Sequence, residues 1–264
     1  MADSDFEDGP DLFAEPDDYY PPSPKPTTET HTLLSGQTLT LHLVGHNPLW
    51  GHHLWNAGRI ISNYLEKNPS LITSKSVLEL GAGAGLPSLT CASLRAQNVV
   101  VTDYPDSDLI DNLRKNISVF YEQFPELRVN DKESLVAEGY CWGADPSPLL
   151  SLLPSEEKEA GFDVLILADL LFNHSEHAKL LDSIKKTLKK NKDSTALVFF
   201  TPYRPWLLEK DLAFFDLVRE GGMTVEKVLE EKMEKVMFEK DRGDEELRRT
   251  VFGFVVKWAE EDSS

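Results

Sequence analysis

Three glycines at alternate positions, Gly81, Gly83 and Gly85, directly follow a short apolar run that starts at Val77. Glycine at such positions lets the backbone turn at positive φ and leaves no Cβ between the chain and a ligand. Asp103 stands 22 residues after Gly81, at the end of the next apolar run. This spacing is typical of a carboxylate that binds the ribose of a nucleoside held over the first turn. The sequence therefore predicts a nucleoside-binding site.

The order of the glycines distinguishes between nucleoside ligands. The dinucleotide-binding fingerprint requires a glycine three positions after its second one, and this chain has Leu86 there. The loop at residues 79–85, ELGAGAG, instead resembles the Glu-x-Gly-x-Gly-x-Gly loop of S-adenosylmethionine-dependent methyltransferases with the seven-strand fold. A turn that only packs a helix on a strand is the alternative, and the position of Asp103 argues against it. We expect the methyl donor rather than a nicotinamide cofactor.

Strands and helices alternate along the chain and would place these residues at one edge of a sheet. Apolar runs typical of buried strands occur at residues 77–80, 98–102, 136–142, 162–169 and 196–200. This alternation predicts a doubly wound sheet. Two further strands, near 223–229 and 250–257, are joined without a long helix, so we expect the last strand to be antiparallel. The amphipathic helix over residues 106–124 places Lys115 and Asn116 on its solvent face.

Two elements precede the glycine loop. Residues 31–44 alternate apolar and polar side chains, as in a strand or hairpin, and a helix is predicted over residues 54–65. Trp50 and Trp55 lie near the start of this helix, on either side of the pair His52-His53. Two adjacent histidines without partner ligands make a poor metal site, so we interpret them as structural or substrate-lip residues. We expect Trp50 to pack in the core.

The composition indicates a folded and strongly acidic protein. The 264 residues include 45 Asp and Glu but only 27 Lys and Arg, which gives a formal charge of −18. This acid excess argues against a nucleic-acid backbone as the main partner. The longest apolar runs fall short of the roughly 20 residues that span a bilayer, and the N-terminus does not follow the signal-peptide pattern. With two cysteines the chain cannot build a disulfide framework. We expect a cytoplasmic monomer without a nucleic-acid or membrane partner.

The N-terminal segment differs from the rest of the chain. Residues 1–30 hold nine acidic residues, one lysine and six prolines, a composition typical of disorder. We expect this segment to be flexible and residues 31–264 to form a single domain. Residues 230–249 are also highly charged, and their pattern is compatible with an extended arm or a helix. Both segments are candidates for walls around an extended basic peptide.

Six sequence blocks together resemble one protein family: HNPLWGHHLWNAG, LELGAGAGLPSL, VVTDYPD, GYCWG, ADLLFNHSEH and FEKDRGDEELRRTVFGF. They are similar to the seven-strand protein lysine methyltransferases related to nicotinamide N-methyltransferase, and within that group to fungal enzymes that methylate the N-terminus of elongation factor 1-alpha. The resemblance implies a Rossmann-like α/β fold, with a seven-stranded, mostly parallel sheet and an antiparallel last strand. It also implies S-adenosyl-L-methionine as methyl donor, S-adenosyl-L-homocysteine as product and elongation factor 1-alpha as protein substrate.

The resemblance implies roles for individual residues as well. Cofactor-binding roles fall on Trp55 beside the methionine end, on Glu79, Gly81, Ala82 and Gly83 in the loop, on Asp103 at the ribose hydroxyls, on Trp142 against the adenine and on Ala168 at the end of the fourth strand. Asp169 and Phe172 match the Asp-x-x-Phe/Tyr element that this family sets beside the methyl-accepting amine, which implies catalytic roles. Asp169 as a cap of the following helix is the alternative. A tryptophan wall suits the flat face of adenine, and an aromatic face or a carboxylate suits a sulfonium.

The predicted activity is methylation of the N-terminal amine of elongation factor 1-alpha, and of an adjacent lysine. Transfer from a sulfonium to a neutral amine is an in-line displacement, so catalysis rests on alignment and desolvation. An α-amine, with a pKa of about 8, is partly neutral at physiological pH, whereas a lysine at about 10.4 must first lose a proton. Two alternatives remain: a small-amine N-methyltransferase of the nicotinamide type, and a catalytically silent cofactor-binding module that acts through protein interaction.

Overall fold

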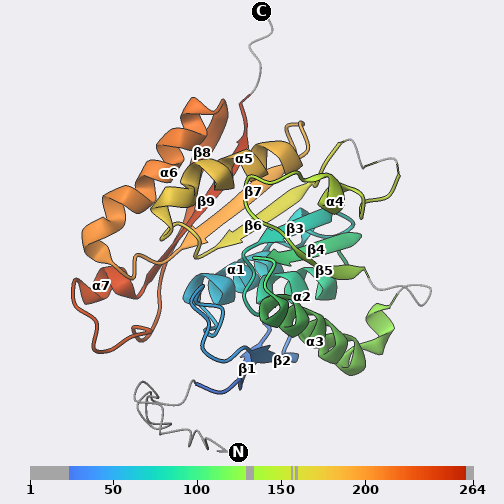
Figure 1. Ribbon diagram of the computed structural model, residues 1–264, viewed down its shortest axis with the longest axis horizontal. Helices are drawn as coiled ribbons and strands as arrows, with labels where there is room; N and C mark the ends of the chain where they lie inside the picture. The colour runs from blue at the N-terminus through green and yellow to red at the C-terminus, as the bar shows by residue number, and fades with distance from the viewer. Residues whose placement is uncertain (1–23, 129–133, 156, 158–159, 260–264) are drawn as a thin grey trace, which may run out of the picture.

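A seven-stranded sheet forms the centre of the computed structural model, which describes residues 24–128, 134–155, 157 and 160–259 (Figure 1). Its strands are β3 (Ser76–Leu80), β4 (Asn98–Asp103), β5 (Leu135–Gly139), β6 (Val164–Ala168), β7 (Thr195–Phe200), β8 (Met223–Lys232) and β9 (Thr250–Trp258). They lie in the order β5-β4-β3-β6-β7-β9-β8. Strands β3 to β7 pair in parallel, whereas β9 runs antiparallel to both β7 and β8. The predicted fold, with its antiparallel last strand, is confirmed.

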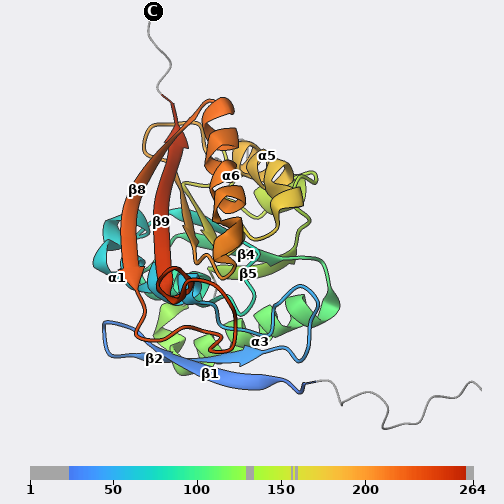
Figure 2. The ribbon, with the colours of Figure 1, turned by 90° about the vertical axis from the view of Figure 1, so that its left-hand side faces the viewer.

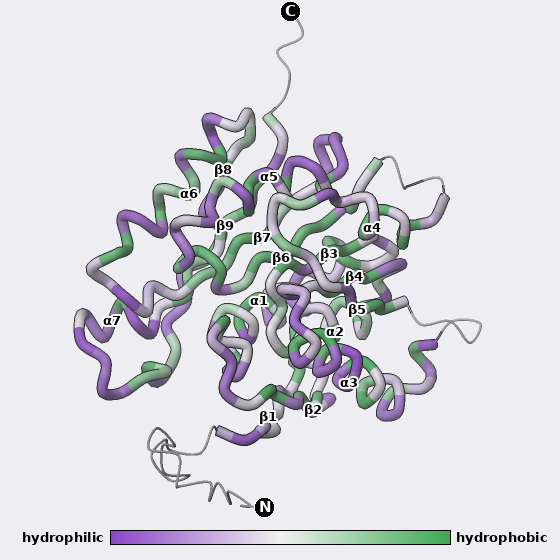
Figure 3. Tube along the Cα trace, viewed as in Figure 1, coloured by the Kyte–Doolittle hydropathy of each residue, from purple (hydrophilic) through white to green (hydrophobic). Residues whose placement is uncertain are grey.

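Helices cover both faces of this sheet. Helices α1 (Asn56–Lys67), α2 (Leu86–Ser93) and α3 (Ser107–Gln123) pack on one face, and α4 (Ser147–Leu150), α5 (His177–Thr187) and α6 (Leu208–Glu220) pack on the other. Because successive strand side chains point to opposite faces, Val77 joins the first layer and Leu78 the second. Figure 3 shows the central strands β6 and β7 as largely hydrophobic. Burial on both faces explains why these strands read as continuous apolar runs.

Several shorter helices lie between the main elements. They are η1 (Pro69–Leu71), η2 (Pro125–Leu127), η3 (His174–Glu176), η4 (Pro205–Leu207) and α7 (Glu245–Arg248). Helix α7 falls within residues 230–249, which comprise the end of β8, a loop and this single helical turn rather than one continuous arm or helix. Among the residues that the structure describes, no helix has the length and apolarity to cross a membrane.

A separate hairpin of β1 (Thr27–Thr32) and β2 (Thr38–Leu43) lies along α3 (Figure 2). The side chain of Asn116 joins the two, since its Oδ1 accepts the His42 N–H at 2.8 Å and its Nδ2 donates to the His42 carbonyl at 2.9 Å. Nδ2 also donates to the carbonyl of Ala84 in the glycine loop, at 2.9 Å. Asn116 is 1% exposed, so its predicted place on the solvent face is wrong, whereas Lys115 is exposed as expected.

The fold begins before residue 31. Strand β1 starts at Thr27, and the carbonyl of Pro24 accepts the backbone N–H of His46 at 3.1 Å. Residues 24–30 are therefore attached to the body of the protein, although they fall within the segment for which the composition predicts flexibility. Residues 1–23 of that segment lie outside the described residues.

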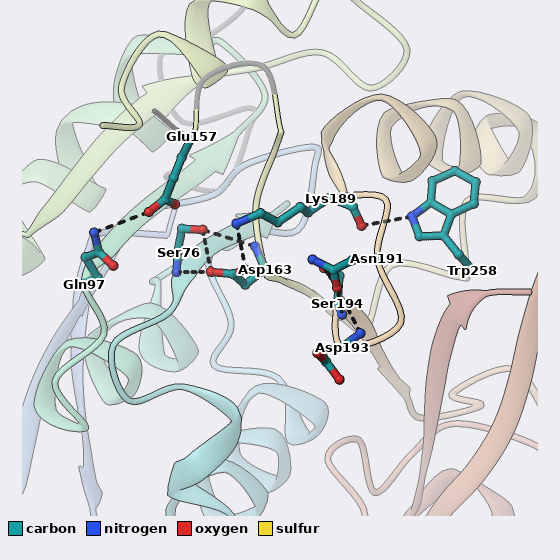
Figure 4. Close-up of polar contacts among 9 residues, drawn as sticks. All are labelled: Ser76, Gln97, Glu157, Asp163, Lys189, Asn191, Asp193, Ser194 and Trp258. Carbon is teal, nitrogen blue, oxygen red and sulfur yellow. Dashed lines mark hydrogen bonds and ion pairs between the residues drawn. The ribbon is translucent and has the colours of Figure 1, made fainter. Parts of the chain in front are cut away.

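Asp163 joins the amino ends of β3 and β6 (Figure 4). The glycine loop follows the opposite, carboxyl end of β3. Oδ2 of Asp163 accepts both the backbone N–H and the hydroxyl of Ser76 at 3.0 Å, which joins the starts of β3 and β6. The Lys189 ammonium lies 3.2 Å from Oδ1, and the Lys189 carbonyl accepts the indole N–H of Trp258 at 3.1 Å. With this edge tied together, the loops at the opposite, carboxyl edge carry the site.

Candidate functional site

A cavity of about 600 Å³ opens at the carboxyl ends of the parallel strands. Open α/β sheets bind ligands at this edge. Every residue that the sequence predicts for the site lines this cavity: Trp55, Glu79, Gly81, Ala82, Gly83, Asp103, Trp142, Ala168, Asp169 and Phe172. The structure thus brings together residues from β3, β4, β6, the loop after β5 and the residue before α1.

The glycine loop provides open space within the cavity. Gly81 and Gly83 have φ angles of 60° and 57°, the left-handed region that favours glycine. A Cβ at Gly81 would lie 2.7 Å from Cδ2 of Leu170 and 3.2 Å from Cζ2 of Trp142. A Cβ at Gly83 would meet no atom of the described residues within 4 Å. Gly81 is therefore required for close packing against Leu170 and Trp142, whereas Gly83 leaves room for a ligand.

Asp103 ends β4 and holds the glycine loop. Its Oδ2 accepts the backbone N–H of Gly83 and its Oδ1 accepts that of Tyr104, both at 2.7 Å. Burial raises the pKa of Asp103, while these two N–H donors act in the opposite direction. Each carboxylate oxygen has a second lone pair, and the side chain lines the cavity, so ribose hydroxyls can donate to it.

Glu79 holds the start of helix α2, which directly follows the glycine loop. It is 1% exposed, and one carboxylate oxygen accepts the backbone N–H of Ser88 at 2.9 Å as well as the Ser88 hydroxyl. Ser88 lies in the first turn of α2, whose preceding residue, Gly85, has no side chain with which to cap it. Glu79 thus satisfies a free N–H at the helix start. Burial raises the pKa of Glu79 to about 8, although both bonds from Ser88 oppose the shift.

Asp169 caps helix α1, which lies far from it in the sequence. Its Oδ2 accepts the backbone N–H of Ala57 at 2.9 Å and the hydroxyl of Tyr203 at 3.3 Å, and its Oδ1 accepts the N–H of Thr201 at 2.7 Å. Ala57 is in the first turn of α1, where Trp55 makes no side-chain cap within the described structure. Asp169 therefore caps α1, and the alternative that it caps the following helix is wrong. Burial raises the pKa of Asp169 to about 7 despite the three donors.

The loop between β6 and α5 presents Phe172 at the cavity mouth, where its side chain is 40% exposed. The carbonyl of Phe172 accepts a hydrogen bond from the Arg204 guanidinium at 2.6 Å. In the same loop, Nε2 of His174 lies 2.6 Å from Oδ1 of the buried Asp211 on α6. These two attachments hold the loop against the neighbouring elements, so Phe172 forms a fixed part of the rim.

An aromatic cluster surrounds Trp55. Its indole N–H donates to the carbonyl of Trp50 at 3.1 Å, and its ring centroid lies 5.0 Å from that of Tyr203 and 5.9 Å from that of Phe238. Trp50 lines the cavity and is 49% exposed, so its predicted place in the core is wrong. Its φ of 65° places a bulky residue in the left-handed region, at a cost of about 1–3 kcal/mol.

Sequence reasoning missed several of these residues. Trp50 offered no clear signal, because a tryptophan before a helix usually packs inward. Tyr203 and Phe238 come from segments far along the chain, and nothing in their spacing connects them to Trp55. Tyr104, which also lines the cavity, directly follows Asp103, and that position is a signal that would have identified it. Within the described ranges, no group of three or more His, Cys, Asp or Glu side chains has metal-binding geometry.

Solved structures with a similar fold include two putative methyltransferases of low sequence identity. A putative RNA methyltransferase from Pyrococcus horikoshii has a TM-score of 0.52 at 19% identity, over 83% of this chain and 90% of that one. A putative methyltransferase complexed with SAH has a TM-score of 0.54 at 12% identity, over 87% of this chain and 56% of that one. At these identities the likeness shows the fold alone.

Sequence comparison gives a closer relationship. The protein N-terminal and lysine N-methyltransferase of Neurospora crassa is 56% identical over 262 residues, 98% of this chain and 91% of that protein. The enzyme of the same name from Emericella nidulans is 50% identical over 262 residues, 99% of each chain. Residues 34–220 match the model of a family described as lysine methyltransferase. The chain therefore belongs to the lysine methyltransferase family.

Proposed function

We propose that this protein transfers a methyl group from S-adenosyl-L-methionine to the N-terminal α-amine of elongation factor 1-alpha, and to an adjacent lysine. The names of the similar fungal enzymes support the two kinds of amine. The six sequence blocks that resemble the elongation-factor enzymes support the substrate. The observation that carries the proposal is the convergence of all predicted donor-binding and acceptor-side residues on one cavity.

The donor side of the cavity fits S-adenosylmethionine. Gly83 leaves space for it, Asp103 offers acceptor lone pairs to the ribose hydroxyls, and Trp142 offers an apolar wall to the adenine. The Trp55 ring suits the positive charge of the sulfonium. When bound, this donor supplies a methyl group already activated by the positive sulfur.

The acceptor side is formed by Trp55, Asp169 and Phe172. The amine nitrogen would bond to the methyl carbon as the sulfur–carbon bond breaks and its electron pair stays on sulfur, and the methylated ammonium would lose a proton to bulk water after it leaves the apolar rim. Asp169 is engaged with three donors, so its main task is to hold α1 and Trp55 in place while its charge favours a cationic end of the substrate. The apolar rim excludes water and aligns the amine.

Elongation factor 1-alpha acts in translation, in the cytoplasm. We therefore propose that this enzyme is cytoplasmic and that it acts as a monomer. The test is a transfer assay with labelled S-adenosylmethionine and elongation factor 1-alpha that lacks its initiator methionine. The matched control is the same protein with its α-amine acetylated, and nicotinamide is the small-amine acceptor. Mass spectrometry locates the methyl groups.

We expect label on the N-terminal amine of the unmodified elongation factor, loss of that label in the acetylated protein, and none in nicotinamide. Label in nicotinamide alone would replace the proposal with small-amine methylation. If neither acceptor is labelled although S-adenosylhomocysteine binds, the protein is a silent cofactor-binding module and the proposed substrate is excluded.

A further inference from the structure

Several large hydrophobic side chains are exposed to solvent. In the part of the chain that the structure describes, they are Leu34, Leu49, Trp50, Tyr104, Phe172, Trp206 and Leu212. Four of these, Leu49, Trp50, Tyr104 and Phe172, line the cavity. Exposed apolar side chains scattered singly need no explanation, but a group around one opening is typical of a binding surface.

The four rim residues divide between the two ends of the cavity. Tyr104 follows Asp103 and its N–H donates to the Asp103 carboxylate at 2.7 Å, which places it at the ribose end. Trp50 is joined to Trp55 by the hydrogen bond from the Trp55 indole, and the two rings lie 6.4 Å apart. Trp50 therefore continues the Trp55 wall outward, on the side where the acceptor amine must enter.

The backbone of Trp50 is strained, and the turn that causes this strain does not require an indole side chain. Its N–H donates to the carbonyl of Asn47 at 3.0 Å and its own carbonyl accepts the Trp55 indole, which fixes the turn. The resulting φ of 65° favours glycine, yet this position carries tryptophan, the residue type with the largest side chain. That side chain is 49% exposed. Both bonds are made by backbone atoms and would be retained by glycine. The indole itself is the part that needs a functional explanation.

The surroundings of the Trp50 ring suit a cation. The ring stacks beside His52, with centroids 5.9 Å apart and planes at 23°, and beside His53, at 6.5 Å and 23°. Burial lowers the pKa of both histidines, and the neighbouring imidazole adds to the effect in each case. A lowered pKa disfavours the charged form of both imidazoles, which reduces their repulsion of a cation. An indole face binds ammonium groups and also packs well on the planes of peptide bonds.

We propose that Trp50 determines specificity for the protein substrate, and that its indole face is the wall on which the amine-bearing end of the substrate polypeptide lies. The inference rests on the proposed function and extends it to a substrate-binding residue. Leu49, 46% exposed and adjacent in sequence, enlarges the same apolar surface. A substitution at Trp50 leaves the residues assigned to the donor, such as Asp103 and Trp142, unchanged, so we expect donor binding to be retained.

The experiment compares Trp50→Ala, Trp50→Gly and Trp50→Phe with two controls. Trp206→Ala removes an equally exposed tryptophan, 49%, that lies against the Arg242 guanidinium and does not line the cavity. Tyr104→Ala removes a rim residue from the ribose end. For each variant we would measure KM and kcat with elongation factor 1-alpha, Kd for S-adenosylhomocysteine by calorimetry, and Tm.

We expect Trp50→Ala and Trp50→Gly to raise KM by about tenfold or more, the loss typical of a buried aromatic anchor, with Kd for S-adenosylhomocysteine unchanged. Trp50→Phe retains an aromatic face and should recover most of the KM. Because glycine relieves the left-handed strain, Trp50→Gly should keep or raise Tm, whereas a purely structural tryptophan would lower it. Trp206→Ala should match the wild type, and Tyr104→Ala should weaken S-adenosylhomocysteine binding with little change in KM.

Three results would overturn the inference: an unchanged KM in Trp50→Ala, a weakened affinity of that variant for S-adenosylhomocysteine, or a lowered Tm in Trp50→Gly. The wild-type measurement distinguishes failure of the proposed function from failure of the inference about Trp50. If the wild type methylates no protein N-terminus, the proposed function fails and the inference fails with it. If the wild type is active and Trp50→Ala behaves identically, only the inference fails.

Discussion

The Oδ2 atom of Asp169 accepts the backbone N–H of Ala57 at 2.9 Å, across 112 residues of sequence. This bond connects the carboxyl end of β6 to the first turn of α1, immediately after Trp55. A single carboxylate therefore both faces the cavity and fixes the helix that carries one wall of it. The family resemblance points to Asp169 as a residue beside the amine, and the structure adds a mechanical role that a short sequence motif does not display.

The first prediction concerns the two functions of Asp169. Asp169→Ala leaves the N–H groups of Ala57 and Thr201 buried without their partner, at about 1–3 kcal/mol each, so the free energy of unfolding should fall by several kcal/mol. Asp169→Asn loses the charge and keeps one carbonyl acceptor, but it turns an NH2 group toward the N–H of Ala57 or of Thr201, so one of these buried groups loses its acceptor. We expect this variant to lose less stability than Asp169→Ala and to lose kcat/KM by about tenfold or more. Urea unfolding and initial rates measure the two effects, and equal stability of the alanine variant would contradict the capping role.

The second prediction is a fall in stability with rising pH. Burial raises the pKa of Glu79 from 4.5 to about 8 and that of Asp169 from 3.8 to about 7. Between these unfolded and folded values the native state binds more protons than the unfolded chain, so their contribution to stability is fully present at low pH and is lost as the pH rises to about 8. Urea unfolding at several pH values across this window should show the decline.

Glu79→Gln tests the origin of this slope. Glutamine keeps an acceptor for Ser88 but does not ionise, so the variant should show a shallower decline than the wild type. The matched control, Glu122→Gln, changes an exposed glutamate on α3 and should leave the slope unchanged. If Glu79→Gln and the wild type show the same decline, a raised pKa of Glu79 does not contribute to it.

The third prediction separates ligand binding from helix capping at the end of β4. Asp103→Asn removes the charge and replaces one acceptor oxygen with an NH2 group, which also costs the hydrogen bond from Gly83 or from Tyr104, and it should raise Kd for S-adenosylhomocysteine by about tenfold or more. Asp106→Asn is the control three positions away, where the side chain caps α3 by accepting the Asp108 N–H at 2.9 Å. Asparagine caps equally well, so this variant should bind normally. Isothermal calorimetry measures both, and equal affinities would remove Asp103 from the binding site.

The fourth prediction uses two glycines with the same backbone requirement. Gly83 and Gly36 have φ angles of 57° and 89°, and at either one an added Cβ would meet no described atom within 4 Å. Alanine at either position should therefore cost about 1–2 kcal/mol of stability. Only Gly83→Ala places a methyl group in the donor space, so it should weaken S-adenosylhomocysteine binding while Gly36→Ala does not. Weak binding in both variants would indicate general destabilisation instead.

Local patterns predicted the sheet, the glycine loop and Asp103, whereas the family resemblance supplied the other site residues, such as Trp142 and Phe172. Buried parallel strands produce continuous apolar runs, and each such run ends at the same edge of the sheet. Asp103 and Asp169 come directly after β-strand runs, and Gly81 and Gly83 stand in the first turn, so their convergence on one cavity follows from topology. Backbone physics fixes these positions almost independently of what packs around them.

The contacts that sequence did not reveal depend on tertiary neighbours. Helical periodicity identifies Asn116 as a polar residue but cannot show that the β1–β2 hairpin covers it and takes its hydrogen bonds. For Trp50, hydrophobicity predicts burial, but a strained turn leaves the side chain exposed. The capping of α1 by Asp169 joins segments whose proximity exists only in the folded chain.

Strand β8 forms one of the two edges of the sheet, beside the antiparallel β9. An edge strand of ten residues with unpaired backbone groups is a template on which another chain could add a strand and begin to aggregate. Half of its residues are charged, namely Glu226, Lys227, Glu230, Glu231 and Lys232, and a register shift separates Lys227 from Leu229. A strand added to β8 would bury these charges and would have to follow the irregular register. Both requirements oppose strand addition and so protect this edge of the sheet from self-association.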